Sequence, residues 1–516
     1  MTTPADPGPA RADVPDPAPT TITAPATAPP TGAPAGPDEA TVVTGAAATA
    51  PAGLEWNRMH PVTPAVKGWK VVVVLVVIAA QQFSDDVVQA RDLLAGRGWL
   101  VALAVLAGAA LLAFGYAALA WRMTRYALDD EAVYLHSGVL FRQQRKARLD
   151  RLQAVDVVQP ILARLLGLAE LKLEVAGGPG SAVSLAFLKE DQADTLRAEL
   201  LARAAGLRRQ EGQPAESAPE QPVLEVPASR VVGAMIRSGA AVGLVLGLVA
   251  VAVIIAVTGE PTAALALAPG FLGVAGVFWS QFSRDFNFHA AISPDGIRLR
   301  HGLLESRSQT VPPGRVQALK VQQGLLWRRS GWWRVEVNVA GYGGAQDSAA
   351  ENVLLPVGDR DEALTAVWLV LPDLGTDDPR GVLTAALEGT GDEGGFTTIP
   401  RRARWLDPWA WRRTGYRVTE RALLIRSGRL VRRLVVVPHE RTQSLGVEQG
   451  PLQRRLGVAS LAVHSTPGPV SPRVPHLAVD VAARLLDEQT RRARTARAGA
   501  GPEQWMRSAV EPGPAS

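Results

Sequence analysis

The chain lacks cysteine and the familiar catalytic motifs. None of its 516 residues is cysteine, which excludes disulfides, iron–sulfur clusters and thiolate zinc sites and fits a reducing compartment. It has no P-loop, no glycine motif for a dinucleotide, no H-E-x-x-H and no G-x-S-x-G. The seven histidines are scattered, and no pair has metal-ligand spacing. The sequence therefore predicts no enzyme, no catalytic residue, no metal site and no cofactor.

Charged residues are missing from the centres of four apolar runs. The runs span residues 66–84, 99–121, 239–257 and 261–282. A bilayer core of about 30 Å needs roughly 20 apolar residues in a helix. The last three runs meet that length, and the first is weaker because Lys67 and Lys70 lie near its start. We expect two transmembrane hairpins, within residues 54–121 and 229–282. Transporters usually need charged groups near the bilayer midplane, so their absence counts against transport.

Lys and Arg are concentrated outside the predicted hairpin turns. The second turn contains only Glu260 as a charged residue, whereas Arg230, Arg237 and Arg284 flank its hairpin. Cytoplasmic flanks carry the excess of Lys and Arg in membrane proteins. We therefore predict a multi-pass plasma-membrane protein whose N-terminus and folded domains are cytoplasmic. The stretch 1–53 is rich in Pro, Ala and Thr, lacks a signal-peptide pattern and is predicted to be disordered.

One pattern of residues occurs three times. An Arg-x-Gln pair is followed at the same spacing by a second Gln, an Arg and a Gly, and another Gly precedes each pair. Repetition of this kind indicates three copies of one domain. The preceding glycines are Gly138, Gly302 and Gly428. The pattern consists of Arg151, Gln153, Gln159, Arg164 and Gly167; Arg315, Gln317, Gln323, Arg328 and Gly331; and Arg441, Gln443, Gln449, Arg454 and Gly457.

Apolar and polar residues alternate within each copy, as in "VYLHSGVLFRQQ", "VEVNVAG" and "LAVHST", and each copy ends in a helix-like segment. Such alternation is typical of antiparallel strands. We predict a multi-domain membrane protein with two transmembrane α-helical hairpins and three small β-barrel or sandwich domains, each closed by a C-terminal helix. The predicted domains are residues 122–207, 283–372 and 398–497, with linkers at 208–228 and 373–397 and a disordered tail at 498–516.

The repeated Arg, Gln and Gly residues allow two interpretations. In the first, the Arg and Gln side chains hydrogen-bond backbone carbonyls at the corners between strands, as buried polar groups must, and the Gly supplies a positive φ. In the second, the same residues form a docking or headgroup-binding surface that all three copies share.

A short segment before the third copy interleaves Trp with Arg, and no apolar hairpin precedes it. Aromatic belts and basic clusters are typical of segments that lie on an anionic membrane surface. Alternatively, the Trp side chains pack on the domain core and the Arg side chains are solvated. The residues are Arg401, Arg402, Arg404, Trp405, Trp409, Trp411, Arg412 and Arg413.

The repeats and their flanks resemble a bacterial family. Together with the repeated pattern, "NRMHPVTP" before the first apolar run and "IPRRARWLDPWAWRRTGYRVT" before the third copy are similar to the bacterial membrane-flanked proteins with pleckstrin-homology-like (PH-like) domains. This is the bPH2 or DUF304 group, and the chain is most similar to its long YdbT-like members. The resemblance covers about residues 54–497. It implies two transmembrane hairpins, three PH-like domains and a role in the cell envelope, and it implies no particular ligand.

These observations predict a non-enzymatic scaffold or binding protein of the bacterial cell envelope. Its expected partners are the lipid bilayer, anionic lipid headgroups, a partner protein or a second copy of the chain. Nucleic acid is not expected, because the basic stretch "WRRSGWWR" lies inside a domain of a predicted membrane protein. One alternative is a transporter or export accessory subunit, which would need polar groups along its helices. The other is a lipid-modifying enzyme, which would need an acid, base or nucleophile at the interface.

Overall fold

The computed structural model describes most of the chain from Trp56 to Gly499. The described residues are 56–59, 63, 98–129, 131–138, 143–175, 183–204, 221–259, 268–293, 296–340 and 352–499. The first apolar run, the N-terminal stretch predicted to be disordered and residues 500–516 lie outside them.

The first repeat consists of two groups of antiparallel strands and a closing helix. The first group contains β1 (Trp56–Arg58), β2 (Arg125–Leu128), β3 (Ala132–Ser137) and β4 (Gln143–Arg148), with α3 (Gly98–Met123) inserted between β1 and β2. After the 3-10 turn η1 (Leu149–Arg151), the second group contains β5 (Leu152–Pro160), β6 (Leu168–Val175) and β7 (Val183–Lys189). The helix α5 (Glu190–Ala204) then packs on these strands. Leu171, Phe187 and Leu200 are among the side chains buried between the two groups and the helix.

The second repeat has the same order of strands. Its first group contains β8 (Gln221–Val226), β9 (Phe288–Ser293), β10 (Gly296–His301) and β11 (Glu305–Val311). The described residues between β8 and β9 contain the helices α6 (Ala228–Ile236), α7 (Gly239–Thr258) and α8 (Ala268–Asp285). The 3-10 turn η3 (Pro313–Arg315) leads to β12 (Val316–Gln323), β13 (Trp333–Val339), β14 (Val353–Gly358) and the closing helix α9 (Arg360–Val370).

The third repeat begins with an additional helix, α10 (Pro379–Leu387). Its first group of strands contains β15 (Thr397–Thr398), β16 (Gly415–Val418), β17 (Ala422–Ser427) and β18 (Arg432–Pro438). After η7 (His439–Arg441) come β19 (Ser444–Glu448), β20 (Val458–His464), β21 (Arg473–Ala478) and the closing helix α12 (Val479–Gly499).

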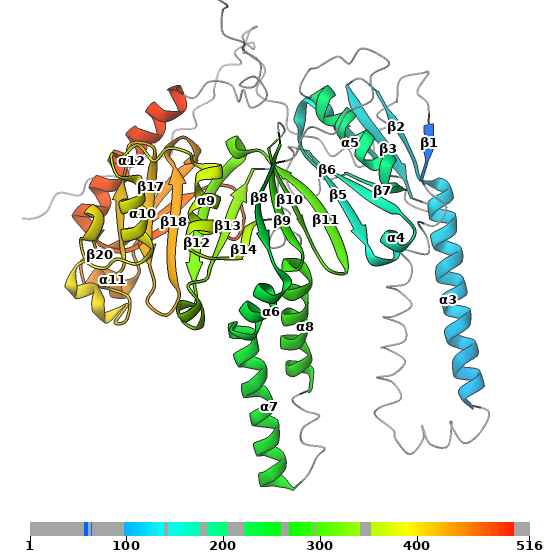
Figure 1. Ribbon diagram of the computed structural model, residues 1–516, viewed down its shortest axis with the longest axis horizontal. Helices are drawn as coiled ribbons and strands as arrows, with labels where there is room; N and C mark the ends of the chain where they lie inside the picture. Colours follow the sequence, from blue (N-terminus) through cyan, green and yellow to red (C-terminus); the bar gives the residue numbers. More distant parts are fainter. Residues whose placement is uncertain are drawn as a thin grey trace, which may run out of the picture. The chain divides into compact units, whose positions relative to one another are not determined.

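The repeats share sheets across their boundaries. One seven-stranded sheet has the order β7-β6-β5-β11-β10-β9-β8, and another has the order β14-β13-β12-β18-β17-β16-β15. The second strand group of one repeat is therefore continuous with the first group of the next, through the pair β5–β11 (the first junction) and the pair β12–β18 (the second junction), as Figure 1 shows. A four-stranded sheet, β1-β2-β3-β4, and a three-stranded sheet, β19-β20-β21, contain the remaining strands of the described chain.

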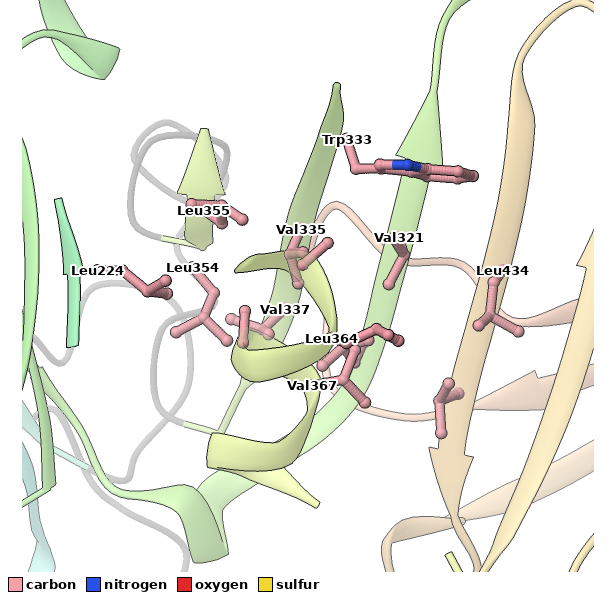
Figure 2. Close-up of a cluster of buried hydrophobic side chains, with 14 of the residues drawn as sticks. Leu224, Val321, Trp333, Val335, Val337, Leu354, Leu355, Leu364, Val367 and Leu434 are labelled. Atoms are coloured by element: carbon pink, nitrogen blue, oxygen red, sulfur yellow. The ribbon is translucent and has the colours of Figure 1, made fainter. Parts of the chain in front are cut away.

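The hydrophobic core also crosses the second junction. Leu434 of β18 is paired with Val321 of β12, and both side chains belong to the cluster that contains Trp333 and Val335 of β13 (Figure 2). Leu434 and Val335 are fully buried. Because one continuous core and one hydrogen-bonded ladder join the second and third repeats, these repeats form a single packed unit at this boundary.

The prediction of three small barrel or sandwich domains therefore needs one correction. The triplicated strand order and the closing helices α5, α9 and α12 are present, but the sheets are fused pairwise between repeats. Alternation along a strand identifies which face is buried, and it carries no information about which strand lies beside an open edge. Segments expected to be linkers also differ, because β8 lies within 208–228 and α10 lies within 373–397. The helix α10 forms where it buries Val382, Leu383, Ala386 and Leu387.

The prediction of two transmembrane hairpins is wrong. Within the part of the chain that the structure describes, one helix, α7, is long and apolar enough to cross a membrane. The helix α8 is described from Ala268 to Asp285, and the first part of the predicted run, residues 261–267, lies outside the described residues. The run 66–84 lies outside the described residues. Hydropathy located the apolar segments, but it predicted more spanning helices than the described residues contain.

Two glycines of α7 face α8. A Cβ atom added at Gly243 would lie 3.7 Å from Val274, and one added at Gly247 would lie 3.7 Å from Phe271. Both distances are ordinary van der Waals contacts, so a Cβ atom would fit at either position and the packing of the two helices does not require glycine there. The third glycine of the row, Gly239, has no such neighbour within 4 Å.

Candidate functional site: the repeated corner and the Trp/Arg segment

The repeated pattern surrounds one short helical turn in each copy. The turns are α4 (Ile161–Leu165), η4 (Leu325–Ser330) and α11 (Pro451–Arg455). The pattern's final glycine follows the end of each turn within two residues, and Gly167, Gly331 and Gly457 have φ values of +63°, +68° and +60°. These values lie in the left-handed region that glycine adopts without a steric penalty. The expected positive φ is confirmed at all three positions.

The second Gln of the pattern closes this turn in two copies. The amide Nε2 of Gln323 donates to the backbone carbonyl of Trp332 at 3.2 Å, and Nε2 of Gln449 donates to the carbonyl of Val458 at 3.0 Å. Trp332 and Val458 each follow the glycine that ends the turn, so the two hydrogen bonds are equivalent. In these two copies, the hydrogen bond and the length of the turn that it encloses explain the spacing between Gln and Gly. In the first copy, Gln159 lies in the first junction, opposite Ser306.

The Arg-x-Gln pairs lie where the first strand group passes into the second. Arg151, Arg315 and Arg441 are the last residues of η1, η3 and η7. Arg315 donates to the carbonyl of Leu152 at 3.4 Å, which links the second repeat to the first. Gln317 is 6% exposed and donates to the carbonyl of its neighbour Arg315 at 3.3 Å. The third-copy Gln443 is exposed, and the side chain of Gln153 lies outside the described part of the structure.

The Arg inside the turn differs between copies. Arg328 donates to the backbone carbonyls of Arg429 and, at 3.2 Å, Leu430, in the turn before β18. It therefore binds the third repeat across the second junction. Burial, together with nearby Arg432 and Arg429, lowers the pKa of Arg328. Its equivalents Arg164 and Arg454 are exposed.

The Trp/Arg segment occupies the position where the second repeat inserts its helices. It connects β15 to β16, whereas α6, α7 and α8 connect the equivalent strands β8 and β9. The segment begins with the 3-10 helix η6 (Arg401–Trp405) and returns through a series of turns. Arg402 donates to the carbonyl of Gly457 at 3.0 Å, which attaches the segment to the repeated corner of the third repeat.

Two Trp side chains of this segment point into solvent. Trp405 is 73% exposed and Trp409 is 63% exposed. The guanidinium of Arg404 lies over the Trp405 ring, 5.5 Å from its centroid. Large exposed aromatic side chains are uncommon on a solvated surface and are characteristic of contact sites. The exposed cations beside them are Arg401, Arg402, Arg404 and Arg412.

Trp411 and Arg413, in contrast, face the interior. Trp411 packs against the core of the third repeat. Arg413 is 5% exposed and donates to the carbonyls of Ala386, Leu387 and Gly389 at the end of α10. For these two residues the structure agrees with the interpretation that the segment packs on the domain.

Arg426 also donates hydrogen bonds to backbone carbonyls at the end of α10. It is fully buried and donates to the carbonyls of Ala385, Gly391 and Arg413. Burial, together with the nearby cations Arg426, Arg432 and Arg328, lowers the pKa of Arg413 to about 9. Two buried guanidiniums here satisfy the terminal carbonyls of α10. Sequence reasoning missed Arg426, because its position in β17 resembles that of any polar residue in an alternating strand.

The chain matches a known family in three places. A family model described as "Bacterial PH domain" covers residues 72–204, 231–368 and 381–493. The fold defines a protein built from three PH-like repeats, and the chain belongs to the bacterial PH domain family. No curated protein and no solved structure matches it significantly. PH-like domains are generally binding modules, so three of them in one chain indicate a scaffold or binding role.

Proposed function

We propose that this protein is a non-enzymatic scaffold of the bacterial cell envelope that is held at the plasma membrane through α7. Its PH-like repeats lie on the cytoplasmic side and bind partner proteins, and its third repeat contacts anionic lipid through the Trp/Arg segment. The observation that carries the proposal is the exposure of Trp405 and Trp409 beside four exposed Arg side chains.

The helix α7 supports a position at the membrane. It has 20 residues and a mean hydropathy of 3.0, and none of the most apolar part is buried by the rest of the chain. Val245, Leu246 and Val257, for example, are 59%, 62% and 80% exposed. Each such side chain loses about 1.5–3 kcal/mol by remaining in water rather than in an apolar environment, so a hydrocarbon surrounding stabilises this helix.

The Trp/Arg segment supports a second contact with lipid. Trp side chains favour the interface between headgroups and acyl chains, because the ring is apolar and its N–H is polar. Each Arg near an anionic leaflet contributes about 1 kcal/mol of attraction. Since the segment lies where the second repeat inserts α6, α7 and α8, it would provide the third repeat with surface attachment in the place of those helices.

A single fluorescent label tests this contact in the full chain. The sequence has no cysteine, so Pro408→Cys introduces one thiol between Trp405 and Trp409, at an exposed position. We would attach a polarity-sensitive fluorophore and reconstitute the protein in phosphatidylcholine vesicles, with or without phosphatidylglycerol. The emission should shift to the blue with phosphatidylglycerol and shift back as salt is added.

Two comparisons make the result specific. Adding Trp405→Ala and Trp409→Ala to the labelled protein should abolish the blue shift. A label at Gln192→Cys, an exposed position on α5 of the first repeat, should not respond to lipid composition. If the label at position 408 emits identically in both kinds of vesicle, the segment is not an anionic-lipid contact and the proposal fails.

A further inference from the structure

The two junctions between repeats use the same strand register. At the first junction, Gln159 pairs with Ser306 and Val157 with Ser308. At the second, Gln323 pairs with Arg432 and Val321 with Leu434. The two sets of pairs are equivalent when the repeats are aligned. Gln323 has the same position in the second repeat as Gln159 in the first, and Arg432 has the same position in the third repeat as Ser306 in the second. The second strand group of each repeat thus presents an edge that fits the first strand group of another repeat.

One copy of each edge is left over at the two ends of the series. Within the described chain, β4 and β19 have a neighbouring strand on one side only. The strand β4 is equivalent to β11 and β18, and β19 is equivalent to β5 and β12. An open strand edge exposes unpaired backbone N–H and C=O groups and is a template for another strand.

The exposure of one valine side chain marks β19 as an edge without a partner strand in the described chain. Val157 and Val321, which are covered by the two junctions, are 5% and 1% exposed. Their equivalent in the third repeat, Val447, is 45% exposed. Val447 is apolar although no strand of the described chain covers it, as expected for a residue that another strand would cover.

We propose that β19 of one molecule pairs with β4 of a second copy of this chain, in the register of the two internal junctions. The pairs would be Val447 with Gln144 and Glu448 with Gln143. Such an interface is heterologous, since different surfaces meet, and successive copies form a closed ring or an open array. The proposal is independent of any contact with lipid.

The charges of the two edges are compatible with this pairing. Glu448 of β19 forms an ion pair with Arg473 at 2.9 Å, and Arg145 of β4 would lie diagonally across the same sheet face as a second cation beside this carboxylate. Basic residues on β4 do not oppose the pairing, because β18 also carries Arg432 and Arg433 and is paired with β12. The solvated charges of β4 limit the strength of the contact and keep the isolated edge soluble.

The backbone of β19 also presents its hydrogen-bonding groups correctly. Val463 of β20 donates its N–H to Pro472 in the direction of β21, so it turns its polar groups away from β19. Its partner in β19, Leu445, and Val447 two residues later therefore direct their N–H and C=O groups to the open edge. These are the groups that a second copy of β4 would bind.

Two single-cysteine proteins test the pairing directly, because the native chain has no cysteine. Full-length chains carrying Gln143→Cys or Glu448→Cys would bear different tags, be co-expressed, purified in mild detergent and treated with a mild oxidant. The proposal predicts a disulfide-linked heterodimer of the two tagged chains, and no dimer from either chain alone. Glu448→Cys combined with Arg148→Cys is the register control, since those positions would be separated by about 16 Å along the strands, beyond disulfide reach.

A proline on the open edge provides an independent variant. Val447→Pro removes an N–H that points away from β20, so the fold is retained and circular dichroism should match wild type. It should abolish both the cross-link and any concentration-dependent increase in mass measured by light scattering. Val447→Ala, which keeps the N–H, should retain the cross-link.

Three results would overturn the proposal. The first is a mixture that yields no more dimer than the register control. The second is cross-linking of the Glu448→Cys chain with itself, which would show back-to-back pairing of two β19 strands. The third is unchanged association of the folded Val447→Pro variant, which would place any oligomer interface elsewhere.

Discussion

Arg334 is the centre of a buried ionic cluster that attaches the end of α8 to β13. Its Nη1 donates to Oδ2 of Asp285 at 2.6 Å, and its Nε donates to Oε1 of Glu336 at 2.9 Å. The Nζ of Lys320 lies 2.6 Å from the other oxygen of Glu336. The side chains of Arg334 and Asp285 are only 10% and 8% exposed, so each charge depends on its neighbours for solvation.

Replacing Arg334 by Met should strongly destabilise the second repeat. Met preserves most of the volume but removes all the donors, which leaves Asp285 in a buried site without its ionic partner. Breaking a buried pair in this way costs about 3–5 kcal/mol, equivalent to a factor of roughly 10²–10³ or more in the local opening equilibrium. By comparison, Arg433→Met on the exposed part of β18 should change stability by less than about 0.5 kcal/mol.

The effect should depend on pH. Burial alone would raise the pKa of Glu336, but Arg334 and Lys320 outweigh it and hold this pKa below its ordinary value. In the wild type, therefore, Glu336 contributes stability above its unfolded pKa and loses that contribution as the pH falls through its folded pKa. Without Arg334, only Lys320 opposes the effect of burial, so the pKa of Glu336 rises above its wild-type value and less stability is lost when this carboxylate is protonated. The difference between wild type and Arg334→Met should shrink as the solution becomes acidic.

Amide hydrogen exchange of β13 and β14 in the full chain measures this difference locally, without assuming that the whole chain unfolds in one step. The reasoning is refuted if Arg334→Met protects these strands as well as Arg433→Met does. It is also refuted if a large loss of protection is the same at neutral and acidic pH, because the loss would then come from packing and not from unpaired carboxylates.

Two further predictions concern backbone and histidine. At Gly302 (φ +118°) an added Cβ would lie 1.8 Å from the carbonyl oxygen of Glu305, whereas at Gly331 (φ +68°) it would meet nothing within 4 Å. Gly331→Ala should therefore lower the free energy of unfolding by only about 1–2 kcal/mol, the strain of a left-handed alanine. Gly302→Ala should lower it distinctly more, as measured by thermal unfolding. Equal losses of stability in the two variants would contradict the steric argument. His439 is 1% exposed and bonded to Gln489 at 2.8 Å, and burial lowers its pKa below the ordinary 6.5. The free energy of unfolding should therefore be highest above about pH 6.5 and should fall as the pH drops from there to the folded-state pKa of His439. The substitution His439→Gln should reduce this fall, as measured by denaturant titrations at several pH values.

Local features of the repeats were predictable from the sequence. The positions of Gly167, Gly331 and Gly457 indicated a positive φ, and the structure has it at each. The triplicated pattern predicted three copies of one domain, which the family match confirms. Both inferences depend on short-range geometry, which the residues within one turn determine. Whether the repeated Arg and Gln residues bind a partner stays a prediction.

The Trp/Arg segment shows where local information ends. The composition of the segment predicted the same environment for its three Trp residues. In the structure, Trp405 and Trp409 are exposed, whereas Trp411 packs on the core. Arg413 likewise resembled its neighbours in sequence and is buried against the end of α10. Which side chain of such a segment is solvated depends on the path of the backbone over a distant surface, and no periodicity within the segment reports that path.

The sequence by itself determined the number of repeats, the alternating faces of the strands, the glycine-terminated corners and the apolar character of α7, because each depends on residues close together in the chain. Only the tertiary structure decided that β5 pairs with β11 and β12 with β18, so that three repeats share two continuous sheets. Strand pairing uses the backbone C=O of every residue and the backbone N–H of every residue except proline. The choice of neighbour therefore depends on which edges remain open after each repeat has folded.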